Sequence, residues 1–337
     1  MPSLHARSDN LPSTAPPPST TSPRWRRAIN RFTTMLGDLY YGAIQNAGIT
    51  MLARRLRQGA LVLCYHNVVP QSARGTFGDP GLHLPLDQFT SQVAWLKNHY
   101  RVIPLGELVS RLASGRSVRG VAAITFDDGY TGALTLAWPL LRTLGLPATV
   151  FLVAAAPERR SLFWWDHPAV VRGQAGSRTR RLLSLGGDAG LVLKDAGATA
   201  MADVPTAAAY LPADWPLIAQ QAAAGLELGA HTISHRTLTK LRDDELAYEL
   251  VDGVRLIEEQ TGVKPVAFSY PYGIWDVRVR DAVRRAGYRS AVTLDYGLNP
   301  SGIDLCALRR VNVPASISLP AFAGWTAGMR PRRARAA

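Results

Sequence analysis

The sequence predicts an α/β fold in which parallel strands alternate with helices. Short apolar runs of the kind that form buried strands recur along the chain. Segments with apolar residues at helical spacing lie between several of them, and chemically active side chains directly follow several of the apolar runs. Alternation of this kind is typical of β-α-β units, whose helices connect one parallel strand to the next.

The expected elements follow in chain order. The run 60–65 is an uninterrupted apolar segment and predicts the first buried strand, and 121–126 predicts a second one. The helix at 243–262 is indicated by apolar residues three or four positions apart, with Gly262 at its carboxyl end. By the same criteria we expect further strands at 148–153, 226–230, 266–270, 290–294 and 307–313, and further helices at 87–99, 133–144 and 276–286.

Composition excludes several classes of protein. The chain has 337 residues, 47% hydrophobic and 19% charged, which is ordinary for a globular protein. Two cysteines, Cys64 and Cys306, exclude a disulfide-rich scaffold and a zinc module built on cysteines. The net charge of +13 favours anionic partners in general. No nucleic-acid-binding motif is found, so nucleic acid is not an expected partner.

Four regions are expected. Residues 1–23 are rich in Pro, Ser and Thr and predict a disordered tail. Residues 24–58 predict a basic amphipathic helical lead-in, which either packs on the main domain or rests on an anionic membrane surface. The main domain is expected at 59–318 with an insertion at 157–224, followed by a basic tail at 319–337. No secretory signal is recognised, which predicts a cytoplasmic protein, with the inner membrane face as one possible place.

Two neighbouring carboxylates, Asp127 and Asp128, follow the strand expected at 121–126. The carboxyl ends of parallel strands are where α/β enzymes build their active sites. Alone, the pair would also suit a polar turn before a capped helix. As the chain leaves the strand, both side chains can reach the same opening.

Two imidazoles, His231 and His235, follow the apolar stretch 226–230. At this spacing they share one helical face or converge in a tight turn. Neutral imidazoles suit zinc and similar ions, and two of them with one carboxylate leave coordination positions open for catalysis. Two surface histidines would give the same local pattern.

A third group, Phe268-Ser-Tyr-Pro-Tyr-Gly273, closes another expected strand. Pro271 and Gly273 predict a turn there, and a turn of this kind can present a backbone N–H to a developing oxyanion. Alone, it indicates only the end of a strand.

The three groups together, in this order, resemble the polysaccharide deacetylase family (NodB-homology domain, carbohydrate esterase family 4) over residues 60–315. The resemblance implies a distorted (β/α) barrel with about seven parallel strands. It also implies a divalent metal ion, most often Zn²⁺, with Co²⁺ or Ni²⁺ as alternatives. The implied activity is removal of acetyl groups from a polysaccharide or oligosaccharide.

Carried over from the family, the general base is Asp127, and the metal ligands are Asp128, His231 and His235. The backbone N–H of Tyr272 is expected to stabilise the oxyanion. A carboxylate bound to a metal is a poor base, so two aspartates suit two separate tasks.

Two departures from the family pattern matter. The family places an arginine where this chain has Ser269, so we expect Arg309 or Arg310 to supply the missing charge. The family's usual acid histidine has no counterpart, since no histidine follows His235. His66 is the expected general acid, as in the branch of the family that acts on exopolysaccharide poly-N-acetylglucosamine; a structural histidine is the alternative.

Aromatic residues are expected to bind the sugar. Phe163-Trp-Trp-Asp166 opens the insertion, and its tryptophans either stack on sugar rings or form a hydrophobic plug over the barrel opening. The expected substrate-binding residues are Trp164, Trp165, Tyr270 and Pro271. The predicted function is metal-dependent N-deacetylation of N-acetylhexosamine units. An O-acetyl sugar esterase and a non-catalytic glycan-binding module are the alternatives.

Overall fold

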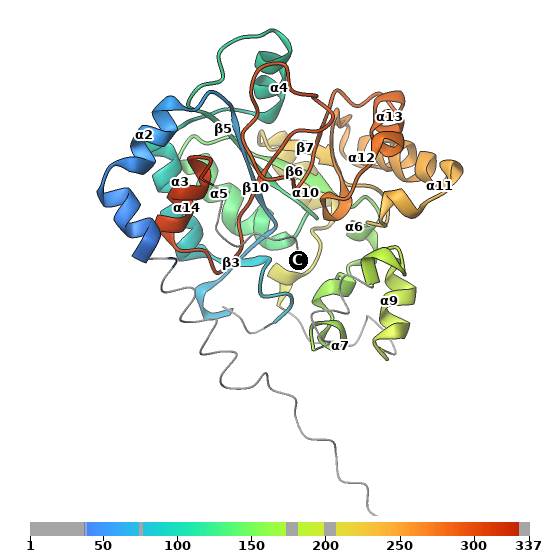
Figure 1. Cartoon of the computed structure of the whole chain (residues 1–337). Coiled ribbons are helices and arrows are strands. Elements are labelled where there is room, and N and C mark those ends of the chain that lie inside the picture. Colours follow the sequence, from blue (N-terminus) through green and yellow to red (C-terminus); the bar gives the residue numbers. More distant parts are fainter. Residues whose placement is uncertain (1–36, 38, 74–76, 173–180, 199–206, 330–337) are drawn as a thin grey trace, which may run out of the picture.

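The computed structural model describes residues 37, 39–73, 77–172, 181–198 and 207–329. Its centre is a sheet of seven parallel strands in the order β10-β1-β5-β6-β7-β8-β9, curled into an incomplete barrel (Figure 1). This confirms the distorted (β/α) barrel. The strands are β1 (Leu61–Tyr65), β5 (Val121–Phe126), β6 (Thr149–Leu152), β7 (Glu227–Ala230), β8 (Ala267–Ser269), β9 (Ser290–Val292) and β10 (Val311–Asn312).

The longest strands form because both of their faces are covered. Every residue of β1 and β5 is buried, which is why their sequences are apolar without alternation. The two strands pair in parallel from Leu61 opposite Ala122 to Tyr65 opposite Phe126. They therefore end together, and the residues that follow them meet at one end of the barrel.

The edge strands β9 and β10 are connected by a chain segment that contacts both edges of the sheet. An isolated parallel bridge joins Val292 to Leu308, and β10 pairs with β1 through Leu63 and Val311. The strand expected at 307–313 is thus split: its first part contacts β9 and its last part pairs with β1. A chain that bridges the two edges in this way brings Arg310 into the interior, where it is fully buried.

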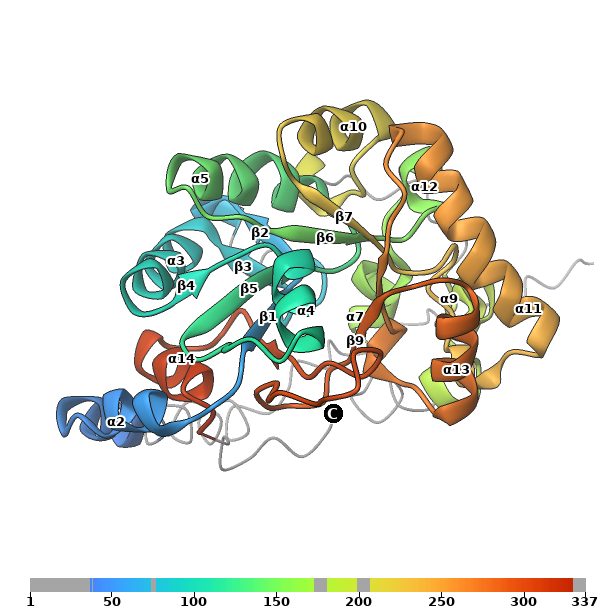
Figure 2. The same cartoon turned by 90° about the horizontal axis from the view of Figure 1, so that it is seen from above.

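Helices surround the sheet, as the view from above shows (Figure 2). The helices expected from the sequence are present, with a π-helical segment inside two of them. Helices α4 and α10, the short 3-10 helix η5 and the short strands β2, β3 and β4 were not expected. The elements are β2 (Asn67–Val69), β3 (His83–Pro85), α3 (Leu86–His99), β4 (Arg101–Val102), α4 (Leu105–Ala113), η2 (Ala133–Ala137), α5 (Trp138–Thr143), α10 (Trp215–Ala223), η5 (Leu238–Lys240), α11 (Asp243–Ala247), η6 (Tyr248–Asp252), α12 (Gly253–Thr261) and α13 (Val277–Arg285).

The insertion is smaller than the expected 157–224. It contains short helical segments, most of which pack around Trp164 and Trp165, while Tyr210 packs against Val69 and Leu162. Helix α10, by contrast, contacts α12 and η2 and is the regular crossover from β6 to β7. The insertion therefore ends before Trp215. Its helical segments are α6 (Ala156–Arg159), η3 (Trp164–Asp166), α7 (Pro168–Val171), α9 (Ala189–Asp195) and η4 (Ala208–Tyr210).

The expected carboxyl-terminal tail is partly folded. Helix α14 (Leu319–Thr326) packs against α3, and its Phe322 is fully buried. This corrects the expectation of a tail from residue 319, because the apolar content of α14 is high enough to join the core. Residues 330–337 lie outside the described residues.

The lead-in is helical where it is described. Residues 39–46 and α2 (Ile49–Leu56) lie at the edge of the molecule beside α14 (Figures 1 and 2). The tail expected at 1–23 and the start of the lead-in fall outside the described residues. Within the part of the chain that is described, no helix has both the length and the apolar character needed to cross a membrane.

Candidate active site

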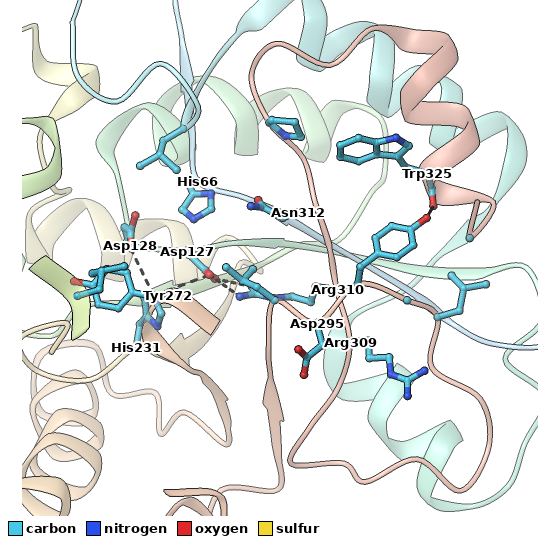
Figure 3. A pocket seen from close by; sticks show the side chains of 18 of the residues that line it. His66, Asp127, Asp128, His231, Tyr272, Asp295, Arg309, Arg310, Asn312 and Trp325 are labelled. Atoms are coloured by element: carbon cyan, nitrogen blue, oxygen red, sulfur yellow. Dashed lines mark hydrogen bonds and ion pairs between the residues drawn. The ribbon is translucent and has the colours of Figure 1, made fainter. Parts of the chain in front are cut away.

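Four parallel strands deliver the predicted site residues to one end of the barrel. His66 follows β1, Asp127 and Asp128 follow β5, His231 follows β7, and Tyr272 follows β8. All of them line one cavity of about 1300 Å³, in which their side chains point toward one another (Figure 3). The site residues therefore converge at one end of the barrel, as the positions of the strand ends predicted.

Asp128, His231 and His235 form a compact triangle of possible ligand atoms. The Nε2 atoms of the two histidines are 3.0 Å apart, and Asp128 Oδ1 lies 3.6 Å from His231 Nε2 and 3.4 Å from His235 Nε2. Ligand atoms about 2.0–2.1 Å from a tetrahedral zinc ion are about 3.3 Å from one another. The three measured separations bracket that value, so these residues fit a small divalent ion.

The imidazoles are held in the state that a metal requires. Nδ1 of His231 donates to the carbonyl of Ser269 at 2.7 Å, which leaves Nε2 with its lone pair toward the triangle. Burial lowers the pKa of both rings, most strongly that of His235, where the neighbouring His231 acts in the same direction. The rings of Trp165 and Tyr272 flank His235, each with its centroid 4.5 Å from the imidazole centroid.

The loop after β7 brings the two histidines together without a helix. His235 has a φ of 61° and Thr232 a φ of 69°, in the left-handed region that side chains with a Cβ rarely adopt. The buried carboxylate of Glu249 holds this shape by accepting from the backbone N–H of Ile233 at 2.9 Å and of Ser234 at 3.0 Å. Of the two arrangements expected from the spacing, the tight turn is the one observed.

Left-handed backbone also occurs at the other site residues. Asp128 has a φ of 71° and Tyr272 a φ of 60°. Strain of this kind costs about 1–3 kcal/mol for each residue and persists where the surrounding structure holds it. Its concentration at Asp128, Thr232, His235 and Tyr272 supports a functional role for this end of the barrel.

Arg310 supplies the positive charge that is missing at Ser269. Its Nη1 and Nη2 atoms donate to Oδ1 and Oδ2 of Asp127, both at 2.7 Å, while Nη2 also donates to Ser269 Oγ at 3.0 Å. Of the two arginines considered from the sequence, Arg310 is therefore the one that contacts the aspartate. Arg309 is exposed and lines the cavity elsewhere.

This pairing sets the charge of Asp127. Burial alone would raise the pKa of the carboxyl group, but the charge and the hydrogen bonds of Arg310 outweigh it and hold the pKa below its usual range. Asp127 is therefore ionised. Because Arg310 occupies both of its oxygens from one side, Asp127 is distinct in role from Asp128, which belongs to the ligand triangle.

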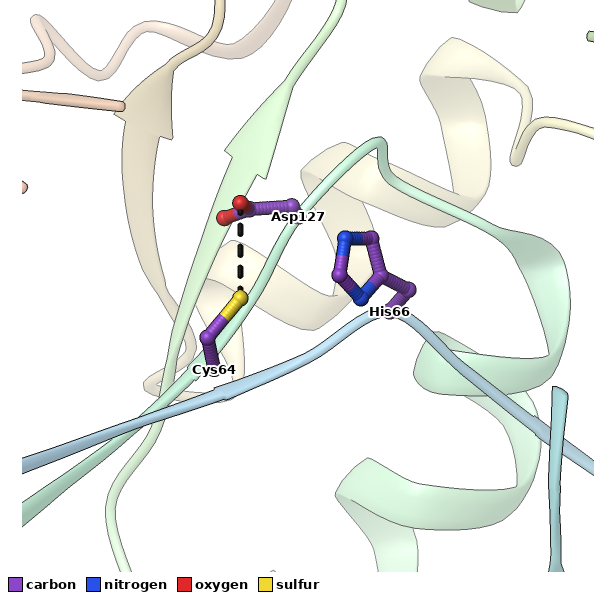
Figure 4. Close-up of side chains that lie close together, drawn as sticks. All are labelled: Cys64, His66 and Asp127. Atoms are coloured by element: carbon purple, nitrogen blue, oxygen red, sulfur yellow. Dashed lines mark hydrogen bonds between the residues drawn. The ribbon is translucent and has the colours of Figure 1, made fainter. Parts of the chain in front are cut away.

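His66 lies beside Asp127 (Figure 4). Possible ligand atoms of Cys64, His66 and Asp127 lie within 4.8 Å of one another, and the Cys64 thiol is 3.5 Å from Asp127 Oδ2. Burial raises the pKa of this thiol well above its usual value, which keeps it protonated. Since Asp127 is already bound by Arg310, this second group does not offer a free carboxylate to a metal.

The aromatic residues expected to bind substrate divide into two kinds. Trp165 lines the cavity and is 5% exposed, whereas Trp164 lies outside the cavity lining and is buried in the cluster around Tyr130 and Val192. Burial of both tryptophans favours the hydrophobic plug, which for Trp165 also forms part of the cavity wall.

Tyr270 and Pro271 do not line this cavity. The hydroxyl of Tyr270 donates to the carbonyl of Cys306 at 2.8 Å, and its ring packs on Phe268 inside the core. The turn after β8 accounts for the difference: residues two apart in a strand would face the same side, but the left-handed φ of 60° at Tyr272 breaks the strand direction, and Tyr272 lines the cavity.

A buried polar network was missed by the sequence analysis. Asp166 accepts from Tyr130 at 2.6 Å and pairs with His83 Nε2 at 2.9 Å. The Tyr130 hydroxyl in turn accepts from Trp165 Nε1 at 2.7 Å. The network links the segment after Asp128 to the aromatic plug. Local sequence offers no signal for it, because His83 and Asp166 are far apart in the chain.

Comparison with known proteins identifies the family. The polysaccharide deacetylase family model matches residues 114–291, just over half of the chain, so the chain belongs to the polysaccharide deacetylase family. The enzyme class expected from the sequence, a hydrolase of the polysaccharide deacetylase type, is thereby confirmed. The match includes both aspartates and both histidines of the site.

Two relatives are similar to this chain over a longer stretch than the family model covers. A protein of Bacillus subtilis (strain 168), YxkH, whose name places it among the polysaccharide deacetylases, is 22% identical over 80% of this chain and 76% of its own. The poly-beta-1,6-N-acetyl-D-glucosamine N-deacetylase of Escherichia coli (strain K12) is 23% identical over 79% of this chain. The matched region is 38% of that longer protein.

Solved structures agree on the fold. The Streptococcus pyogenes deacetylase PplD, in complex with acetate, has a TM-score of 0.59 at 19% identity and covers 81% of this chain and 99% of its own. IcaB from Ammonifex degensii has a TM-score of 0.56 at 21% identity, with 81% and 98% covered.

Proposed function

We propose that this protein hydrolyses acetyl groups from N-acetylhexosamine units of a polysaccharide with the help of a divalent metal ion, most naturally Zn²⁺. The observation that carries the proposal is the pair of unlike aspartates. Asp128 forms a ligand triangle with two neutral imidazoles, while the adjacent Asp127 is held ionised by a buried arginine. The name of the Escherichia coli relative supports an N-acetylglucosamine polymer as the substrate.

Asp128, His231 and His235 would hold the ion. When bound, a divalent ion polarises the acetyl carbonyl and lowers the pKa of a water molecule. An ion held there would be accessible to substrate from the cavity, because the three ligand side chains all line its wall. Cobalt and nickel ions suit the same set of donors.

Asp127 accepts a proton from the attacking water in this proposal. Its lowered pKa makes it a weak base, but it also favours the ionised carboxylate, which is the form that can accept a proton. Arg310 fixes the orientation of the carboxylate through two hydrogen bonds, and Asp127 is among the residues that line the cavity.

His66 protonates the departing nitrogen. An amine is a poor leaving group unless it gains a proton, and His66 is the histidine of the cavity that is outside the ligand triangle. It is also half-buried rather than buried, so it can exchange protons with solvent. The backbone N–H of Tyr272 donates to the oxyanion that forms on the acetyl oxygen.

The proposed reaction can be tested by product analysis. The zinc-loaded protein is incubated with N-acetylated and O-acetylated oligosaccharides, and the loss of acetyl groups is followed by mass spectrometry and by labelling of free amines. We expect amines from the N-acetylated substrates. Loss of acetyl groups only from O-acetylated substrates would indicate the esterase, and no loss from either set would contradict the proposal.

Matched variants make the result specific. Asp127→Asn should abolish turnover while zinc binding is retained, because Asp127 is outside the ligand triangle. Asp188→Asn replaces an aspartate at the start of α9, which does not line the cavity, and should behave like the unaltered protein. If both variants lost the same fraction of their activity, the assignment of Asp127 as the base would lose its support.

A further inference from the structure

Helix α2 turns its apolar side away from the protein. Thr50 is buried, and the guanidinium of Arg54 lies over the rings of Trp95 and Tyr100, 5.8 and 5.9 Å from their centroids. Ile49, Leu52 and Leu56 occupy the opposite side. Amphipathic helices on globular domains normally have the reverse orientation, with the apolar side against the core.

The preceding helical segment continues the same surface. Tyr41 is buried against Gly324 of α14, where any larger residue would collide with its ring. Its neighbours point outward, so the lead-in is anchored to α14 through one side only. We define the α2 patch as the exposed side chains Leu39 (61% exposed), Tyr40 (42%), Ile49 (47%), Met51 (46%), Leu52 (54%) and Leu56 (69%).

Exposed large apolar side chains are concentrated in the α2 patch. The α2 patch contains six of the 15 large apolar side chains that are exposed in the described part of the chain. Contiguous exposed apolar surface of this kind is characteristic of interaction sites. The helices lie at the edge of the molecule in both views (Figures 1 and 2).

The charge around the α2 patch is positive. Residues 39–58 contain three arginines and no acidic residue. Arg55 and Arg57 are exposed, and Arg119 approaches from the barrel to donate to the carbonyl of Arg55. Apolar side chains bordered by arginines complement a bilayer with anionic headgroups.

We infer that the α2 patch binds the surface of an anionic lipid bilayer. Leu52 and Leu56 enter the boundary between headgroups and acyl chains, while Arg55 and Arg119 contact the lipid phosphates. A second copy of this chain fits the surface less well, because a two-fold interface would bring the same arginines against one another. The inference is independent of the proposed chemistry, since it concerns binding alone.

Bilayer binding would orient the cavity. Arg57 and Gln58 directly follow α2 and line one end of the same cavity that holds the ligand triangle. When α2 lies on a membrane, that end of the cavity adjoins the headgroups. A glycan held at the membrane surface would then have a direct path to the site.

The test is co-sedimentation of the full chain with vesicles of phosphatidylcholine alone or with about 30% phosphatidylglycerol. We expect binding to the anionic vesicles that weakens as salt is raised. Leu52→Glu combined with Leu56→Glu should lower the partition coefficient at least about tenfold. Leu191→Glu is the matched control, because Leu191 is 51% exposed on α9 and lies outside the α2 patch.

Three results would overturn the inference. The unaltered protein could fail to sediment with anionic vesicles, or Leu191→Glu could lose as much binding as the double variant. The third is a lipid-free dimer, measured by light scattering, that the double variant converts to monomers; this would assign the α2 patch to self-association. Acetyl release from a soluble oligosaccharide should be equal in all three proteins, so a failure of the proposed function would be seen separately.

Discussion

Replacing Arg310 with methionine tests the central ion pair of the site. Methionine keeps much of the length of the side chain and removes the guanidinium, which is fully buried. The variant loses the two hydrogen bonds to Asp127 and those to Ser269 Oγ at 3.0 Å, to Thr125 Oγ1 at 3.2 Å and to the carbonyl of Thr293 at 2.8 Å. Asp127 is left as a buried carboxylate without its cation.

The expected cost is large compared with ordinary substitutions. Removing one partner of a buried ion pair destabilises a protein by about 3–5 kcal/mol, because the other charge remains buried and unpaired. Urea unfolding followed by tryptophan fluorescence measures the change in the free energy of unfolding. Arg309→Met is the matched control for stability: Arg309 is exposed, and we expect a change within about 0.5 kcal/mol.

A second variant separates charge from packing. Adding Asp127→Asn to Arg310→Met removes the unpaired charge, so the double variant should recover part of the lost stability. Where activity remains, Arg310→Met should also move the acidic limb of the pH profile of kcat/KM upward. The sign follows because Arg310 favours the ionised carboxylate, so its removal raises the pKa of Asp127. If Arg310→Met unfolds at the same urea concentration as Arg309→Met, the ion pair does not have the energetic role assigned to it.

Three further predictions concern the ligands, the loop that holds them and the fold. His235→Ala should weaken zinc binding at least about tenfold in calorimetric titration, and unchanged affinity would exclude His235 as a ligand. Glu249→Ala should weaken zinc binding by about 10–100-fold although Glu249 is no ligand, because it holds the backbone between the two histidines; an effect on unfolding alone would assign it a purely structural role. Burial raises the pKa of Tyr100 to about 12, so its contribution to stability is complete below its unfolded pKa near 10 and is lost as pH rises toward 12. Phenylalanine does not titrate, so between pH 10 and pH 12 only the unaltered protein should lose this stability. Its free energy of unfolding should fall relative to that of Tyr100→Phe by up to about 2–3 kcal/mol. A difference between the two proteins that does not change with pH would contradict this assignment.

The sequence determined where the reactive residues lie along the barrel. Apolar runs located β1, β5 and β7 to within a residue or two, because strands covered on both faces consist mostly of apolar residues. Parallel strands that end at one edge then place Asp127 and His231 together. The same local reasoning could not separate the tight turn at His231–His235 from a helix, since both match the spacing.

Tertiary structure decided the rest. The sequence offered Arg309 and Arg310 equally, and only the path of the chain between β9 and β10 turns Arg310 toward Asp127, 183 residues away. Trp164 was as plausible a sugar-binding residue as Trp165 until packing buried it in the plug. The outward orientation of α2 likewise depends on α14 and α3, which are distant in the chain. Periodicity reports whether a segment has an apolar side, but contacts between distant segments determine what that side faces.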